Sequence, residues 1–523
     1  MANTDRKLIN SVKSNIATLL PKYIDEAGLQ GRNIEHPLDI MVMHKLDAFE
    51  IRDADDDYRI FNYVAEIKEV WELIIEKSVK CLRYFDKREP YFENTTKRPV
   101  AYGVKELSEY FEKYTQFETM LYGGGKYYRD HVVHVFRVWL LGLDCLLEKE
   151  GDYLNRIDVQ KGIVVNSLEK LSIWSMIALT HDLGYPLEKS QGIIEKTKDM
   201  MKSFISNPTV NMDLSFNGIQ NNMNDFVVRF ISSKMREKKE PTTRETPDGT
   251  QPTREKKYVA RLQPKYYFKF QKSLEGYKHG ILSAIVIYKL LIYFLESDFS
   301  INEDYEFDGE ETRQFYIRRE ILRTISAHTC YDVYHLDMLS FAFLLIVVDD
   351  AQEWGRKKIT ELYVKQSSSY LFDNISPYFD TAESMHDGET IKIHKFVAKE
   401  KFDFSEGEID NLKTLLASLM QQSKRYEGIF RDGQDTAKRN FIFEKCCEVV
   451  YNTTKNVTFH VRFEISNDGK PVFEVRVDSS NEKDIRETYG KRFFEDLYKD
   501  YNVSNPTKAA TTEATYCVEE RNE

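Results

Sequence analysis

Hydrophobic residues recur with helical spacing along most of the chain. Near the start, Leu8, Val12 and Ile16 fall on one face of a helix, and the same spacing returns over residues 63–74. Longer apolar runs follow in the middle of the chain, and each suits a buried helix. They are YYRDHVVHVFRVWLLG, LSIWSMIALTHDLGYP, YKHGILSAIVIYKLL, ILRTISAHTC and FAFLLIVVDDAQEWGR. These patterns predict a mainly α fold.

The pattern changes near residue 371. Apolar and polar residues alternate in ETIKIHKFVAKEKFDF and in VTFHVRFEISNDGKPVFEVRV, where Asn467-Asp468-Gly469 is a hairpin signal. Helical spacing returns over residues 483–501, and the tail is rich in Thr, Ala and Glu. We therefore predict four parts: a helical N-terminal lobe (1–115), a helical core (116–370), a small C-terminal α+β domain (371–502) and a disordered tail (503–523).

Six polar residues lie within or at the end of the apolar runs of the central region. They are His134, the neighbours His181 and Asp182, His279, His328 and Asp349. A buried carboxylate or imidazole costs several kcal/mol unless it is paired, hydrogen-bonded or bound to a metal. Distant helices can direct such groups to one centre, so the pattern predicts a site for one or two divalent ions. Imidazole with carboxylate favours Mn, Fe, Co, Ni or Zn, and Mg only where carboxylates and waters dominate.

The order His, His-Asp, His, His, Asp resembles the HD superfamily of metal-dependent phosphohydrolases. The sequence Thr180-His181-Asp182-Leu183-Gly184-Tyr185-Pro186 contains the adjacent pair that gives this family its name, and the resemblance covers Tyr128 to Arg356. It implies a helical HD domain with a basic insertion at about 190–272. It also implies that His134, His181, Asp182 and Asp349 are metal ligands, with His279 and His328 as the additional histidines of the binuclear members. In that family the aspartate matching Asp182 bridges two metals when two are present.

Two positions leave alternatives open. His131 lies one helical turn before His134 and competes with it as a ligand, although we favour His134. Asp350 directly follows Asp349 and is the alternative closing ligand. The other histidines lie in mixed or polar stretches, and we expect them on the surface. They are His36, His44, His335, His386, His394 and His460.

The implied chemistry is attack of water on phosphorus. A metal lowers the pKa of bound water from about 15.7 towards 7, so no covalent nucleophile is needed. Asp182 and His131 are candidate catalytic residues, with His131 as general acid for the leaving group. Phosphate oxygens also need fixed cations, and several basic residues lie within a turn or two of the proposed ligands. The candidates are Arg137 and Lys278 at the reaction centre and Arg129, Lys189 and Arg356 as substrate-binding residues.

Composition places limits on partner and compartment. The 523 residues include 30% charged and 13% aromatic side chains, as in ordinary globular proteins. No run is long and apolar enough to span a bilayer, and the first ten residues contain no apolar signal region. Six cysteines without framework or metal spacing suggest a reducing compartment. We therefore expect a cytoplasmic protein without a membrane partner, and the sequence does not indicate its oligomeric state.

Charge bears on the substrate. The net charge of −11 argues against a general affinity for nucleic acid, which favours a small nucleotide as substrate. The segment from Lys234 to Lys272 is nevertheless basic, and a basic rim could attract oligonucleotides. We therefore expect a phosphohydrolase acting on a nucleotide ester or anhydride, with phosphodiesterases among the possible classes. The alternatives are a nuclease that uses the basic insertion and a sensor that binds nucleotide or metal without turnover.

Overall fold

The computed structural model describes the helical region in several stretches and the C-terminal region mainly as strands. The described residues are 4–30, 34–47, 60–86, 103–124, 130–148, 153–160, 162–203, 219–238, 256–295, 305–330, 333, 339–352, 370–371, 375–376, 382–386, 389–404, 419, 441–451, 457–465, 472–478 and 514–517. The protein is mainly helical with a sheet near the C-terminus, so the predicted fold class is confirmed. Where one predicted domain ends and the next begins stays a prediction.

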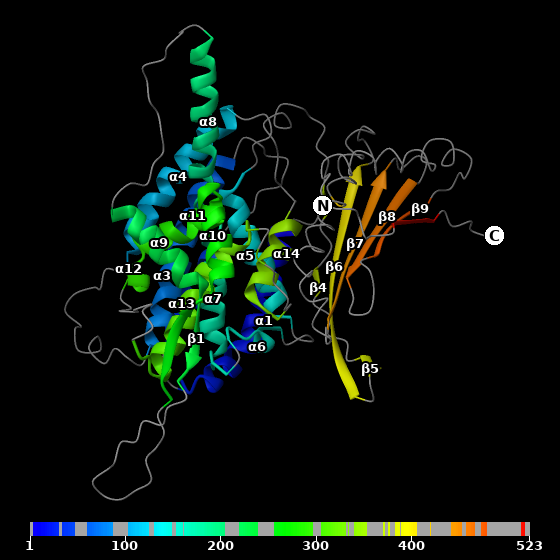
Figure 1. Ribbon diagram of the computed structural model, residues 1–523. Coiled ribbons are helices and arrows are strands. Elements are labelled where there is room, and N and C mark those ends of the chain that lie inside the picture. The colour runs from blue at the N-terminus through cyan, green and yellow to red at the C-terminus, as the bar shows by residue number, and fades with distance from the viewer. Residues whose placement is uncertain are drawn as a thin grey trace, which may run out of the picture.

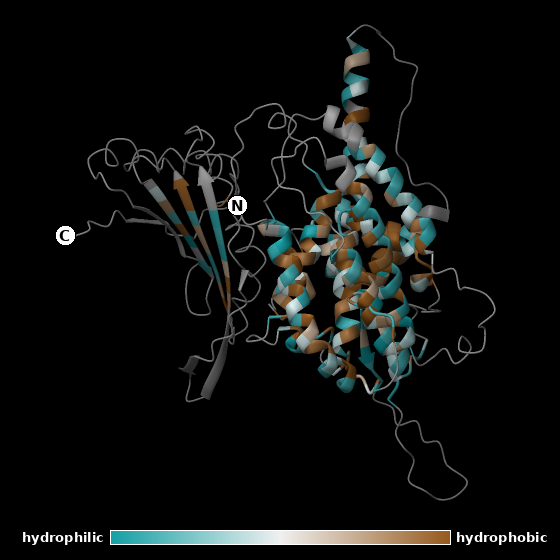
Figure 2. Ribbon diagram, turned by 180° about the vertical axis from the view of Figure 1, so that it is seen from behind, coloured by the Kyte–Doolittle hydropathy of each residue, from teal (hydrophilic) through white to brown (hydrophobic). Residues whose placement is uncertain are grey.

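The helices form one body with an apolar interior, and the sheet stands beside it (Figures 1 and 2). The helices are α1 (Thr4–Glu26), α2 (Ile40–Asp47), α3 (Ile60–Tyr84), α4 (Val104–Gly124), α5 (Val132–Leu146), α6 (Tyr153–Arg156), α7 (Ser167–Thr180), α8 (Tyr185–Lys202), α9 (Ile219–Ser232), α10 (Pro264–Glu275), α11 (His279–Leu290), α12 (Ile292–Leu295), α13 (Gly309–Ala327) and α14 (Phe341–Ala351). The five apolar runs become α5, α7, α11, α13 and α14. The N-terminal spacing is also confirmed, because Leu8, Val12 and Ile16 on α1 are buried.

Helix α7 lies at the centre of the body, and every one of its residues is buried. Its first turn is closed by a capping box in which the Asn166 side chain accepts from the Glu169 backbone N–H, and the Glu169 carboxylate accepts from the Asn166 N–H. The buried Glu169 carboxylate also pairs with Arg313 on α13. The N-terminus of α7 is therefore held in place, and His181 and Asp182 follow directly after its buried last turn.

The segment between α8 and α11 contains two helices and a short hairpin. Strand β1 (Ser233–Glu237) pairs antiparallel with β2 (Tyr258–Leu262), and Tyr258 also bridges Phe307 just before α13. The hairpin therefore lies beside the first turn of α13, whereas His328 follows its last turn. At 1.5 Å per residue, the 19 residues of α13 separate these two ends by roughly 28 Å.

The C-terminal sheet has the strand order β10-β9-β8-β7-β6-β3, with β4 and β5 also paired to β6. The strands are β3 (Tyr370–Leu371), β4 (Ile375–Ser376), β5 (Ala382–His386), β6 (Glu389–Phe404), β7 (Phe441–Tyr451), β8 (Val457–Ile465), β9 (Val472–Asp478) and β10 (Ala514–Cys517). Strands β8 and β9 pair antiparallel, as the predicted hairpin requires, while its turn residues 467–469 lie outside the described residues. Strands β6 and β7 run parallel. The predicted helix over residues 483–501 lies outside the described residues.

Two expectations differ from the structure. Residues 514–517 were expected in a disordered tail, but they form β10, which pairs parallel with β9. The edge of β9 has unpaired backbone N–H and C=O groups that can bind another strand. The composition of the tail does not show that it contains such a strand. His36 was expected on the surface, yet it is only 5% exposed. His44 is exposed as expected, while His335 lies outside the described residues. No described helix is long and apolar enough to cross a membrane.

Candidate metal centre

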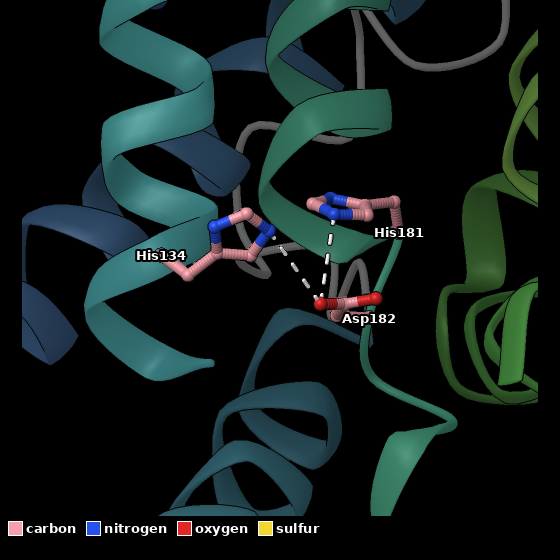
Figure 3. Close-up of side chains that lie close together, drawn as sticks. All are labelled: His134, His181 and Asp182. Atoms are coloured by element: carbon pink, nitrogen blue, oxygen red, sulfur yellow. Dashed lines mark ion pairs between the residues drawn. The ribbon is translucent and has the colours of Figure 1, made fainter. Parts of the chain in front are cut away.

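The carboxylate of Asp182 lies between two groups of imidazoles. Its Oδ2 accepts a hydrogen bond of 2.8 Å from His131 Nδ1 and lies 3.8 Å from His134 Nε2 and 3.6 Å from His181 Nε2. Its Oδ1 lies 3.2 Å from His279 Nε2 and 3.6 Å from His328 Nε2. Figure 3 shows His134 and His181 facing one oxygen of Asp182 from different helices. Each oxygen therefore faces its own set of ring nitrogens.

Two close helix contacts bring these side chains together. A Cβ at Gly184, which follows the His-Asp pair, would lie 2.3 Å from the His279 carbonyl oxygen. A Cβ at Gly280 would lie 2.6 Å from the Ile325 carbonyl oxygen, so only glycine lets α11 approach α13 this closely. The Ser283 hydroxyl joins the same elements, because it accepts from the Gly184 N–H at 2.7 Å and lies 2.7 Å from the His181 carbonyl.

Asp349 closes the first group of donors. Its Oδ1 lies 3.0 Å from His134 Nε2 and 3.8 Å from His181 Nε2. Asp350 belongs to none of the metal-compatible groups among the described residues, and its charge contributes to the raised pKa of Lys445 on β7. The geometry therefore favours Asp349 over Asp350 as the closing ligand, as the sequence pattern did.

The second ring nitrogen of each ligand candidate has its own partner, which turns Nε2 toward the centre. His181 Nδ1 donates to the Ala178 carbonyl at 2.8 Å, and His328 Nδ1 donates to the Ile325 carbonyl at 2.5 Å. His279 Nδ1 lies 2.6 Å from Glu188 Oε2. His134 Nδ1 lies 2.5 Å from Gln352 Oε1. Such outer partners fix the tautomer and ring orientation of metal-binding histidines.

The donor set fits a metal ion. His181 is fully buried, and its Nε2 has no hydrogen-bond partner among the described residues. An orphaned buried nitrogen is costly, and a cation between it and the nearby carboxylates removes that cost. Within the described residues, three overlapping groups have one donor atom each within 4.8 Å of one another. They are His134, His181 and Asp182; His181, His328 and Asp349; and Asp182, His279 and His328. The buried cluster could therefore hold a metal ion.

Charge at the site favours ionised carboxylates. Burial alone would raise the pKa of Asp182, but the charge of His181 and hydrogen bonds from His131 and His279 outweigh it and hold the pKa well below its usual range. Burial opposes ionisation of Glu188 as well, yet its hydrogen bond with His279 lowers the pKa of Glu188 to about 2. Anionic oxygens are the form that metal ions bind.

His131 has a different place from His134. It precedes the first residue of α5, donates to Asp182 and packs on the Tyr185 ring at a centroid distance of 3.7 Å. Its backbone N–H donates to Glu118 Oε1 at 2.7 Å. His131 does not belong to the described metal-compatible groups, whereas His134 does. The geometry therefore favours His134 as the ligand on α5 and leaves His131 beside the centre.

Only some of the basic residues predicted for the site lie near the histidine and aspartate cluster. Lys278 directly precedes α11, and its Nζ lies 3.9 Å from Glu188 at the edge of the site. Lys189 lies over the Tyr185 ring, 4.7 Å from the ring centroid. Arg137 instead binds Asp5 of α1 through Nε and Nη2, with N–O distances of 2.9–3.1 Å, so the structure does not bring it to the cluster. Arg129 and Arg356 lie outside the described residues.

Sequence reasoning missed three polar groups at the site. Gln352 is fully buried beside His134, and its position three residues after Asp349 on one helix face was an available signal. Glu188 lies one turn after Gly184 and binds His279. Tyr114 on α4 is 4% exposed and its hydroxyl has no hydrogen-bond partner among the described residues, although it lies near enough to Asp182 to feel its charge. Tyr114 could not be predicted, because no sequence spacing relates α4 to the helices that carry the ligand candidates.

Comparisons with known proteins assign no family to the chain. Neither a family model, nor a curated protein sequence, nor a solved structure matches the chain. The buried cluster of histidines and aspartates is compatible with an HD-like site, and this compatibility is carried by the side-chain arrangement alone.

Proposed function

We propose that the chain is a metal-dependent phosphohydrolase of the HD type. The observation that carries the proposal is the position of Asp182, whose two oxygens face different sets of buried imidazoles. A carboxylate in that position suits a bridge between two cations, with Asp349 completing one set. Ions held there would supply Lewis acidity and hydroxide at neutral pH. Mn, Fe, Co, Ni and Zn suit the imidazole-rich donor set better than Mg does.

The residues around the cluster have contacts that suit roles in phosphate ester hydrolysis. The buried rings of His134 and His181 keep their Nε2 atoms aimed inward, because their Nδ1 atoms are already engaged. The hydrogen bond between His131 and Asp182 supports the proposed role of His131 as the general acid that protonates a leaving oxygen. Lys278 and Lys189 supply positive charge at the edge, where phosphate oxygens need it.

A small nucleotide is the substrate that we propose. The acidic net charge of the chain disfavours a general attraction to polyanions. The basic hairpin of β1 and β2 lies beside the first turn of α13, at the end of that helix remote from His328. The β1–β2 part of the basic insertion therefore lends no support to an oligonucleotide rim over the metals.

The test is a panel of nucleotides and cyclic dinucleotides incubated with Mn-, Ni- or Zn-loaded protein and separated by chromatography. We expect release of phosphate or opening of a diester, and loss of that activity in Asp182→Ala. Arg137→Gln is the matched control, because Arg137 binds Asp5 away from the cluster. A protein that binds metal but turns over none of the panel would contradict the hydrolase proposal and favour a sensor.

A further inference from the structure

Among the residues that the structure describes, a buried arginine on α13 has no partner for its charge. Arg319 is only 8% exposed, and its Nε has no hydrogen-bond partner in the described part of the chain. Among the described residues, Arg319 forms neither a hydrogen bond nor an ion pair, and its guanidinium carbon lies 5.8 Å from the Tyr316 ring centroid. A guanidinium has five donors, and a buried unpaired charge costs several kcal/mol. We therefore expect an anion to bind the Arg319 guanidinium.

A second guanidinium lies one turn further along the same face. Arg323 donates from Nη1 to the Ile231 carbonyl at 2.8 Å, and its guanidinium carbon lies 4.5 Å from the Tyr266 ring centroid. Like charges four residues apart on a helix repel each other. Burial, and then the charge of Arg323, lower the pKa of Arg319 to about 9, which still leaves it charged at neutral pH.

The nearest carboxylate does not neutralise this pair. Glu320 follows Arg319 directly, so its side chain points about 100° away around the helix. It accepts from the Thr324 hydroxyl at 3.3 Å, and no ion pair joins it to either arginine among the described residues. Burial outweighs the two arginines and raises the pKa of Glu320, and even when ionised this one carboxylate balances only one of the two guanidinium charges. The cluster therefore keeps a positive charge.

This cluster is separate from the metal centre. His328 follows Arg319 by nine residues, which is two and a half helical turns, so the two side chains lie on opposite faces of α13. Arg323 contacts the Ile231 carbonyl of α9 and the Tyr266 and Phe270 rings of α10, none of which supplies a candidate metal ligand. An anion bound here would not be a ligand of the candidate metals.

We propose that Arg319 and Arg323 form a second ligand site, which binds the phosphate group of a small molecule. Arginine forks match the spacing of phosphate oxygens, and a phosphate dianion can balance two guanidinium charges at once. A monovalent carboxylate would leave one charge unbalanced. The site does not depend on whether the metal centre hydrolyses phosphate esters.

The experiment is titration of the full chain, freed of metal with a chelator so that the metal centre takes up no phosphate. Inorganic phosphate, pyrophosphate and ATP are the probes, acetate is the carboxylate control, and calorimetry and thermal unfolding are the readouts. We expect phosphate-bearing ligands to bind and to raise the unfolding midpoint, while acetate does neither. The strongest of the three phosphate probes distinguishes a free anion site from a nucleotide site.

The decisive variant is Arg319→Met, which keeps an apolar stem and removes the charge. We expect it to bind phosphate at least about tenfold more weakly. In phosphate-free buffer it should unfold at the same temperature as the parent chain or higher, because the unpaired buried charge is gone. Arg261→Met is the matched control on exposed β2 and should bind phosphate normally.

Three results would overturn the proposal. One is the absence of any phosphate effect on the parent chain, and another is an equal effect on Arg319→Met. The third is an Arg319→Met chain that unfolds earlier or fails to fold in phosphate-free buffer, since the guanidinium would then have a permanent internal partner. Equal binding of acetate and phosphate would contradict the assignment to a phosphate group.

Discussion

Neighbouring carboxylates on α14 allow a closely matched test of the metal centre. Asp349 and Asp350 have the same side chain, but they lie about 100° apart around the helix. Asp349 Oδ1 is 3.0 Å from His134 Nε2, whereas Asp350 acts on Lys445 of the sheet. We predict that Asp349→Asn loses metal affinity and that Asp350→Asn does not.

The expected size of the loss follows from the number of donors. A metal ion at this site would have four protein ligands, namely His134, His181, Asp182 and Asp349. Structural zinc sites bind with about 10–16 kcal/mol, so one ligand in four accounts for roughly 3 kcal/mol, or a factor of about 100 in affinity. Asp350→Asn should change the affinity less than about threefold. It should cost at most about 1 kcal/mol of stability, because buried Lys445 keeps its ion pair with Glu400 at 2.8 Å.

The measurement is competition for Zn²⁺ or Mn²⁺ against a chromophoric chelator, with urea unfolding of both variants in parallel. Asparagine keeps the size of aspartate, so packing around either position changes little. Equal metal affinities in the two variants would refute the reasoning, as would loss of metal from Asp350→Asn with retention in Asp349→Asn.

Three further outcomes are expected. Gln352→Met should lower metal affinity about 10- to 100-fold in the same competition assay, whereas Gln352→Glu, which still accepts from His134, should not; equal affinities would contradict the orienting role of Gln352. Tyr114→Phe should leave urea stability unchanged or raised, since the buried hydroxyl has no partner among the described residues, and a clear destabilisation would contradict this. Burial holds the pKa of His36 at about 4 against an ordinary 6.5, so the unfolded chain binds more protons between these values, and stability falls as pH falls through that window. Urea unfolding at pH 7.5 and 4.5 should differ by about 2.5 kcal/mol more in the parent than in His36→Gln, and an equal pH dependence would contradict the buried neutral state.

The ligand candidates could be found from sequence because burial makes polar residues conspicuous. His134, His181 and His328 interrupt or end apolar runs, and the structure brings all three to Asp182. The choice between Asp349 and Asp350 could not be made in this way. Both follow the same apolar run, and only the position of the sheet behind α14 separates them.

The outer partners and the cations could not be predicted from spacing along the chain. Glu188 reaches His279 across 91 positions, and Arg137 reaches Asp5 across 132. Charged residues near a ligand in sequence have many possible partners, so nearness alone does not place them at the site. His36 shows the same limit, because a short polar stretch can be covered by a helix that joins it only in the folded chain.

The sheet and the metal centre meet at α14. Phe343 of this helix packs edge-on against Phe396 of β6 and Phe443 of β7, with ring centroids 5.3 and 5.8 Å apart. Figure 1 shows α14 between the helical body and the sheet. A different face of the helix, about 120° around from Phe343, presents Asp349 to His134 at 3.0 Å. Helix α14 therefore contacts the sheet through Phe343 and the candidate metal centre through Asp349.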